Sequence, residues 1–168
     1  LPRQYATKSM KHRKENGTLC RIYEITALYY SINSGILPAA KGRKTGGYMN
    51  QKEAILYLEK LDCEETDRPG AEALKRMVRA HLERIPFENL DIFDFGKVPD
   101  LSEEALFEKL VTNDRGGVCF ELNLSFYSLL KALGYQVYPV AARILWNKSQ
   151  LPPLTHAGLV VEVEGGTY

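Results

Sequence analysis

The sequence predicts an α+β fold in which a group of helices comes first and the beginning of a β-sheet follows. Apolar residues recur at helical spacing in three segments between residues 49 and 111, and again after residue 119. After residue 134 the period changes, and segments 135–146 and 157–163 are rich in residues that strands favour. With 168 residues, of which 45% are hydrophobic, the chain can build a core for one ordinary domain or two small ones.

Residues 1–48 differ in composition from the rest of the chain. They carry nine Lys/Arg and two Asp/Glu, a net charge of +7, whereas residues 49–168 carry a net charge of −6. No helical or alternating period is sustained there, so we expect a basic leader that is disordered or is a translated upstream region ahead of a start codon at Met49. A basic arm for nucleic acid is the alternative, but no aromatic interleaving or recognisable motif accompanies the charge.

The first two predicted helices lie between residues 50 and 86. Asn50 is a suitable N-cap for a helix that reaches Leu61. Pro69 and Gly70 interrupt the chain, and a second amphipathic helix follows and has to end near Pro86.

Two further helices are predicted before the β segments. Ser102, followed by two glutamates, opens the third helix. The fourth begins at or near Cys119 and ends at Gly134, a residue suited to the left-handed conformation after a helix. The predicted organisation is therefore a helical domain over 49–134 and strands over 135–168.

The last residues predict a hairpin. Gly165 and Gly166 are a turn signal after the second β segment, and Tyr168 falls at the opening of the returning strand. Because a lone hairpin is only marginally stable in water, we expect the sheet to continue in further strands and the chain to be truncated at its C-terminus.

The cysteines and histidines do not predict a metal site. The three cysteines form no CxxC pair and the three histidines are scattered, so no zinc-ligand spacing is present. A sparse, odd number of cysteines fits a reducing compartment, and we expect a cytoplasmic protein. No apolar segment approaches the roughly 20 residues of a membrane span, and residues 1–48 show no signal peptide pattern.

Cys119 is the strongest candidate for chemistry. It follows Gly116, Gly117 and Val118 and stands at the beginning of an apolar helix. Glycines leave backbone N–H groups free to face an anion, and a helix N-terminus favours thiolate over thiol. The pattern fits a nucleophile beside an oxyanion site, and it fits equally a small buried hydrophobic cysteine.

His156 is the best available general base. It stands just ahead of the 157–163 segment, so it belongs at the beginning of a strand, 37 residues after Cys119. His12 lies in the leader, and His81 is expected on the solvated face of the second helix. Cys63 has acidic neighbours that would raise its pKa, which makes it a poor nucleophile.

Several residues are expected to support the site structurally: Glu88, Asn89, Arg115, Gly116, Gly117, Glu121 and Asn123. Glu88 and Asn89 lie in a compact segment that leaves a helix and enters a turn, where both can bond backbone groups. Arg115 and Glu121 stand on either side of the thiol and are expected to form a partly buried ion pair.

Three motifs, in order, resemble those of the arylamine N-acetyltransferase family. They are Pro86-Phe87-Glu88-Asn89-Leu90, then Arg115-Gly116-Gly117-x-Cys119-x-Glu121-x-Asn123, then Thr155-His156 ahead of a β segment. The resemblance covers 49–168 and implies a helical first domain followed by a β-barrel with a cysteine-protease-like catalytic core. In this chain the barrel would be incomplete at the C-terminus.

The resemblance also implies a reaction and a set of roles. Acetyl-CoA would acetylate Cys119, with His156 as base, and an arylamine or arylhydrazine would then accept the acetyl group in a ping-pong reaction without a metal. The family's third catalytic residue, an aspartate, would follow Tyr168, so we expect the chain as it stands to be impaired. Phe87 and Val118 would contact the substrate, and Val118 replaces the aromatic residue of many members.

Two other hypotheses are compatible with the sequence. A cysteine hydrolase or transglutaminase-like enzyme would use the same cysteine and histidine. A non-catalytic truncated product would contain the cysteine and the histidine but would have no activity. The sequence predicts neither the acceptor amine nor the oligomeric state.

Overall fold

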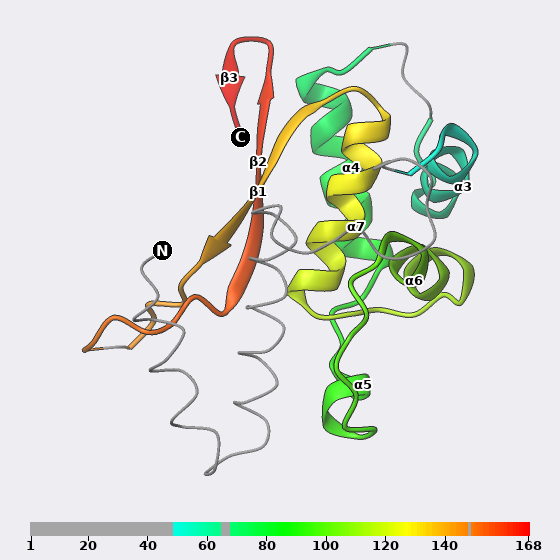
Figure 1. Cartoon of the computed structure of the whole chain (residues 1–168). Helices are drawn as coiled ribbons and strands as arrows, with labels where there is room; N and C mark the ends of the chain where they lie inside the picture. Colours follow the sequence, from blue (N-terminus) through cyan, green and yellow to red (C-terminus); the bar gives the residue numbers. More distant parts are fainter. Residues whose placement is uncertain (1–48, 65–67, 148) are drawn as a thin grey trace.

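The computed structural model describes residues 49–64, 68–147 and 149–168. Figure 1 shows a helical region packed on one side of a small antiparallel sheet, with α7 between the sheet and helices α3 and α6. This α+β arrangement confirms the predicted fold class. The hypotheses about residues 1–48 lie outside the described residues. Within residues 49–64, 68–147 and 149–168, no helix is both long enough and apolar enough to cross a membrane.

The first two helices begin and end close to the predicted positions. Helix α3 spans Gln51–Leu61, and Asn50 caps it: the Asn50 side chain accepts from the Glu53 N–H, and the Glu53 carboxylate accepts from the Asn50 N–H. This reciprocal pair satisfies two of the N–H groups that a helix start leaves free. Helix α4 spans Ala71–Arg84 and ends before Ile85 and Pro86.

The segment between α4 and α7 is more divided than predicted. A short helix that the sequence did not indicate, α5, spans Leu90–Phe93. Helix α6 spans Glu103–Phe107 after the predicted cap Ser102, and the chain continues without a break into a π-helical turn, η1, at Glu108–Thr112. Such turns are rare, and they occur often beside functional sites.

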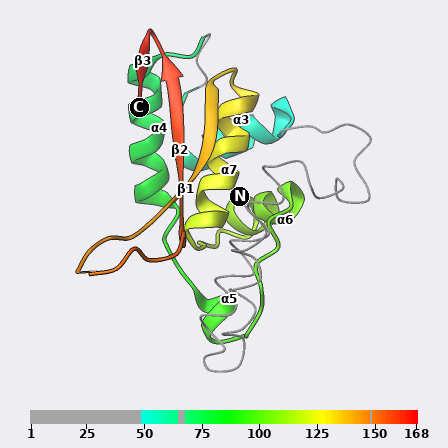
Figure 2. The ribbon, with the colours of Figure 1, turned by 60° about the vertical axis from the view of Figure 1, so that its left-hand side comes forward.

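Helix α7 spans Cys119–Ala132 and is the centre of the molecule. It contacts β1 and β2 on one side and α3 and α6 on the other. In the view of Figure 2, strands β1 and β2 run between α4 and α7, and α7 lies alongside β1. Gly134 follows the helix with a φ of 84°, the left-handed conformation predicted for it.

The sheet has three antiparallel strands in the order β1-β2-β3. Strand β1 spans Gln136–Ala142, β2 spans His156–Val163 and β3 spans Gly166–Thr167. The pairing of β1 with β2 places Ala142 opposite His156 and Gln136 opposite Glu162. The predicted hairpin joins β2 to β3, and Val161 and Tyr168 exchange two backbone hydrogen bonds of 2.9 Å.

Two apolar clusters hold these elements together. The larger packs α3 and α4 against α7 and the sheet. Helix α4 contributes Leu74 and Met77, and the members that are inaccessible to solvent include Tyr57, Leu61, Leu129, Leu130 and Val137. The smaller lies around the start of α7 and contains Val118, Phe120, Leu124, Ala157 and Ile92, with Cys119 packed against it. The candidate nucleophile therefore lies at the edge of a core cluster.

The prediction for His81 is wrong. The side chain is buried inside the larger cluster, with Nε2 3.0 Å from the Tyr57 hydroxyl oxygen and the ring centroid 4.7 Å from that of Phe126. Burial lowers the pKa of His81 to about 4. His81 is therefore a neutral core residue that joins α4 to α3.

Candidate active site

Cys119 is the first residue of α7, and its thiol faces the beginning of β2. The preceding residue, Val118, has extended backbone angles and marks the point where the loop becomes helix. The Cys119 thiol is partly buried and donates a weak hydrogen bond to the Thr155 carbonyl oxygen, with 3.9 Å between the atoms. This contact brings together the two segments that the sequence singled out.

The surroundings of the thiol act on its pKa in opposite directions. Burial raises the pKa of Cys119 above its ordinary value, while hydrogen bonds from the backbone at Ala157, Phe120 and Cys119 itself lower it. The Glu121 carboxylate raises it further. The sequence predicted only the favourable effect of the helix N-terminus, but burial outweighs that effect and the thiol form is favoured.

His156 is the first residue of β2, directly after the residue that accepts from the thiol. Its side chain is exposed, and among the described residues no hydrogen bond joins the imidazole to Cys119. The structure thus brings the nucleophile and the candidate base into the same region without pairing them. The catalytic role of His156 stays a prediction.

Asn123 ties the two segments together. Its amide nitrogen donates to the Cys119 carbonyl oxygen at 2.9 Å and to the Ala157 carbonyl oxygen at 3.2 Å. The side chain lies one helical turn after Cys119, so it can bond both the helix start and strand β2. It fixes the position of the strand that begins with His156 relative to the thiol.

The first two motifs form one structural unit. Phe87 and Gly117 make an isolated parallel bridge, in which the Gly117 N–H donates to the Pro86 carbonyl oxygen at 3.2 Å and the Glu88 N–H donates to the Gly117 carbonyl oxygen at 3.1 Å. A Cβ at Gly116 would collide with the Pro86 carbonyl oxygen. Glycine is therefore required where the two loops meet.

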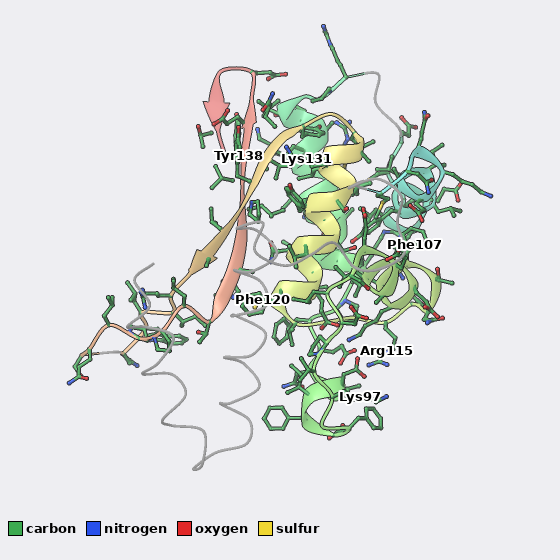
Figure 3. The ribbon with its side chains drawn as sticks, in the orientation of Figure 1. Lys97, Phe107, Arg115, Phe120, Lys131 and Tyr138 are labelled. Carbon is green, nitrogen blue, oxygen red and sulfur yellow. The ribbon has the colours of Figure 1, made fainter. Side chains whose placement is uncertain are left out.

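The predicted ion pair between Arg115 and Glu121 is wrong. Arg115 instead donates to Glu88 from Nη2 at 2.6 Å and from Nε at 3.2 Å, and its Nη2 lies 3.5 Å from Asp91 of α5. These hydrogen bonds raise the pKa of Arg115. Figure 3 shows Arg115 between α5 and the helical body. Arg115 pairs with Glu88 because the bridge between Phe87 and Gly117 brings the two loops side by side.

Glu121 binds Lys109, a residue that the sequence analysis did not single out. Lys109 lies on η1, and its ammonium nitrogen is 2.7 Å from Glu121 Oε1, 2.6 Å from Asp91 Oδ2 and 3.8 Å from Glu88 Oε1. The second Glu121 oxygen accepts from the Val118 N–H at 2.9 Å. A lysine among charged residues on a helical segment gives no sequence signal for this role, because all its partners come from other elements.

The remaining predicted site residues have less direct contacts. Glu88 accepts from the Leu90 N–H at 2.7 Å, which confirms that it bonds backbone nearby. The Asn89 carbonyl oxygen accepts from Ile92 and Phe93 at the start of α5. Phe87 is 66% exposed, whereas Val118 is buried in the smaller apolar cluster. Substrate contact by either residue stays a prediction.

The structure places a cysteine at a helix N-terminus, a glycine-lined loop before it and a histidine at the start of the facing strand, which are components that acyl-transfer sites use. Comparison with known proteins gives the family: its profile, described as N-acetyltransferase, matches residues 71–168. The chain belongs to the arylamine N-acetyltransferase family.

Individual relatives agree with this assignment. The arylamine N-acetyltransferase of Mycobacterium tuberculosis is 39% identical over 117 residues, which are 67% of this chain and 41% of that protein. The arylamine N-acetyltransferase / N-hydroxyarylamine O-acetyltransferase of Salmonella typhimurium is 43% identical over 109 residues, 64% of this chain and 38% of that protein. The chain thus spans about two fifths of the length of these relatives.

Solved structures match the fold over the same region. The Salmonella typhimurium arylamine N-acetyltransferase superposes with a TM-score of 0.67 at 38% identity, covering 70% of this chain and 43% of that one. An arylamine N-acetyltransferase from Bacillus cereus, described as having a Cys-His-Glu catalytic triad, superposes with a TM-score of 0.62 at 29% identity. The superposition covers 70% of this chain and 47% of the Bacillus cereus chain.

Proposed function

We propose that the protein is an arylamine N-acetyltransferase in which Cys119 carries the acetyl group between acetyl-CoA and an aromatic amine or hydrazine. The observation that carries the proposal is the contact of the Cys119 thiol with the Thr155 carbonyl oxygen, directly before His156. Family membership supplies the donor and the acceptor class. Because the chain spans only part of its relatives, the proposal concerns the full-length protein.

In the first half-reaction the Cys119 sulfur attacks the acetyl carbonyl carbon of acetyl-CoA. His156 takes the thiol proton, the bond from the carbonyl carbon to the coenzyme sulfur breaks, and free CoA leaves with that proton. The backbone N–H groups at the start of α7 would stabilise the charge that develops on the carbonyl oxygen. The raised pKa of the thiol makes a base necessary, since the thiolate fraction without one is small at neutral pH.

In the second half-reaction the amine nitrogen attacks the thioester carbonyl carbon. The bond to the Cys119 sulfur breaks, the nitrogen loses a proton to the base, and the free thiol is restored. The exposed ring of Phe87, beside Gly117, would line the acceptor site together with Val118. An acidic third residue, which we expect after Tyr168, would hold the imidazole in its useful tautomer.

Finer features of the fold belong to the same proposal. Strands β1 to β3 would begin the β-barrel of a second domain that starts near residue 135, and the cysteine and histidine would be arranged as in cysteine proteases. The free thiols of Cys63 and Cys119 are compatible with a reducing, cytoplasmic location.

The test is the mass of the protein after incubation with acetyl-CoA. The full-length protein should gain one acetyl group, peptide mapping should place it on Cys119, and an added arylamine should remove it as the acetylated amine. The Cys63→Ser variant should behave like the parent and Cys119→Ser should gain nothing. A parent protein that gains no acetyl group, or gains it on Cys63, would contradict the proposal, and peptidase activity would favour the cysteine hydrolase.

A further inference from the structure

Lys109, on η1, is the centre of a cluster of charged side chains. Glu88, Asp91 and Glu121 each place a carboxylate oxygen within 3.8 Å of its ammonium nitrogen. The Lys109 side chain is only 16% exposed. Burial lowers the pKa of Lys109, but the hydrogen bonds to Asp91 and Glu121 outweigh this effect and the pKa is raised, so the group is charged at neutral pH.

Glu121 connects this cluster to Cys119. It is 2% exposed and lies in the first turn of α7, the turn that Cys119 begins. One carboxylate oxygen accepts from the Val118 N–H and the other from Lys109. A carboxylate so close to the thiol opposes formation of the thiolate, because like charges repel in a poorly hydrated environment. The same carboxylate holds the loop that precedes the nucleophile.

We propose that Lys109 is a positioning residue for the Cys119 thiolate: its ammonium group fixes the Glu121 carboxylate against the Val118 N–H and offsets the negative charge of that carboxylate. Lys109 thereby allows a buried acid to support the loop without suppressing the nucleophile. The inference extends the proposed function, since it concerns the residue that would carry the acetyl group.

The net charge of the cluster around Lys109 predicts the direction in which each substitution shifts the pKa of Cys119. Lys109 on η1 and Arg115 of the loop face three carboxylates, Glu88, Asp91 and Glu121, so this cluster carries one net negative charge. In the described part of the chain, His156 at the start of β2 is a further titratable residue, directly after Thr155, whose carbonyl oxygen accepts from the thiol. Lys109→Met would leave two net negative charges, and Glu121→Gln would leave none. The double variant Lys109→Met/Glu121→Gln would return the cluster to one.

The experiment measures the pH dependence of alkylation of Cys119 by iodoacetamide, followed by peptide mapping in the full-length protein. Lys109→Met should move the midpoint upward by about one pH unit and slow the reaction at neutral pH about tenfold. Glu121→Gln should move the midpoint downward, Lys109→Arg should leave it in place, and the double variant should return it close to the parent value. Lys75→Met is the matched control, because Lys75 pairs with Glu72 on the surface of α4.

Thermal unfolding of each variant separates folding from electrostatics. If Lys109 were purely structural, the double variant would be no more stable to heat than Lys109→Met. The alkylation midpoint of the folded protein would then be the same in the variants and the parent. That result, or a Glu121→Gln midpoint that does not fall, would overturn the inference. Alkylation needs no acetyl-CoA, so the midpoints can shift as expected even where the acetylation test fails, and the two proposals fail separately.

Discussion

Gly116 lies against the Pro86 carbonyl oxygen so closely that no side chain fits between them. A Cβ at Gly116 would also come within 2.9 Å of Glu88 Cγ. This approach allows the Gly117 N–H to donate to Pro86, and it brings Arg115 to Glu88. The loop before the nucleophile is therefore held by the segment that follows α4.

Gly116→Ala should consequently destabilise the protein by about 1–3 kcal/mol, because the backbone at Pro86 has to move. Chemical unfolding followed by circular dichroism measures the change. Gly158→Ala is the control: a Cβ there would meet Val140 Cγ2 at 3.6 Å, an ordinary contact. Equal stability of Gly116→Ala and the parent would show that the two loops do not depend on this close approach.

Asn123→Ala should loosen the junction between α7 and β2. The variant loses the donor to the Cys119 and Ala157 carbonyl oxygens. Two hydrogen bonds of this kind contribute together roughly 1–3 kcal/mol to the free energy of unfolding. The exposed Asn113 at the end of η1 provides a control variant, Asn113→Ala.

The same Asn123→Ala variant should acetylate more slowly at saturating acetyl-CoA, since β2 would no longer be held beside the thiol. Rapid-quench measurement of the acetyl-enzyme follows this step. A variant that loses stability but acetylates at the parent rate would show that Asn123 supports the fold alone.

Local signals explain what the sequence could predict. The cap residues Asn50 and Ser102 and the left-handed Gly134 act on their own helix ends, so the ends of α3, α6 and α7 follow from neighbouring residues. The ordered motifs likewise located Cys119 and the segment that faces it.

Partners distant in the sequence explain what it could not predict. His81 is buried because Tyr57, 24 residues earlier, lies opposite it. Arg115 binds Glu88, 27 residues earlier, and leaves Glu121 to Lys109. Periodicity gives the face of a helix but not the element that will cover it, so these pairs appear only once the helices are packed.

Acid should weaken the fold through His81. Its folded-state pKa of about 4 lies below the ordinary value of 6.5, so the unfolded chain binds the proton more tightly. The stability that comes from keeping His81 neutral is fully present above pH 6.5 and is lost as the pH falls toward 4. It amounts to roughly 3 kcal/mol for this shift.

Urea unfolding at several pH values between 4.5 and 7.5 measures this effect. His81→Gln cannot titrate, so its free energy of unfolding should fall less steeply with acid than that of the parent. Parallel slopes for the two proteins would contradict the assignment of the acid sensitivity to His81.

The turn between β2 and β3 offers a stabilising change. Glu164 and Gly165 both have positive φ, 53° and 74°, as the central residues of a type I′ turn require. Glycine accepts this conformation freely, but glutamate does not, and asparagine at the first position is favoured. Glu164→Asn should therefore raise the free energy of unfolding by up to about 1 kcal/mol. Gly165→Ala, which places a Cβ at a positive φ, should lower the free energy of unfolding. Urea unfolding of the two variants measures these opposite changes. A destabilised Glu164→Asn would indicate that the interaction of Glu164 with Lys75 outweighs the strain in the turn.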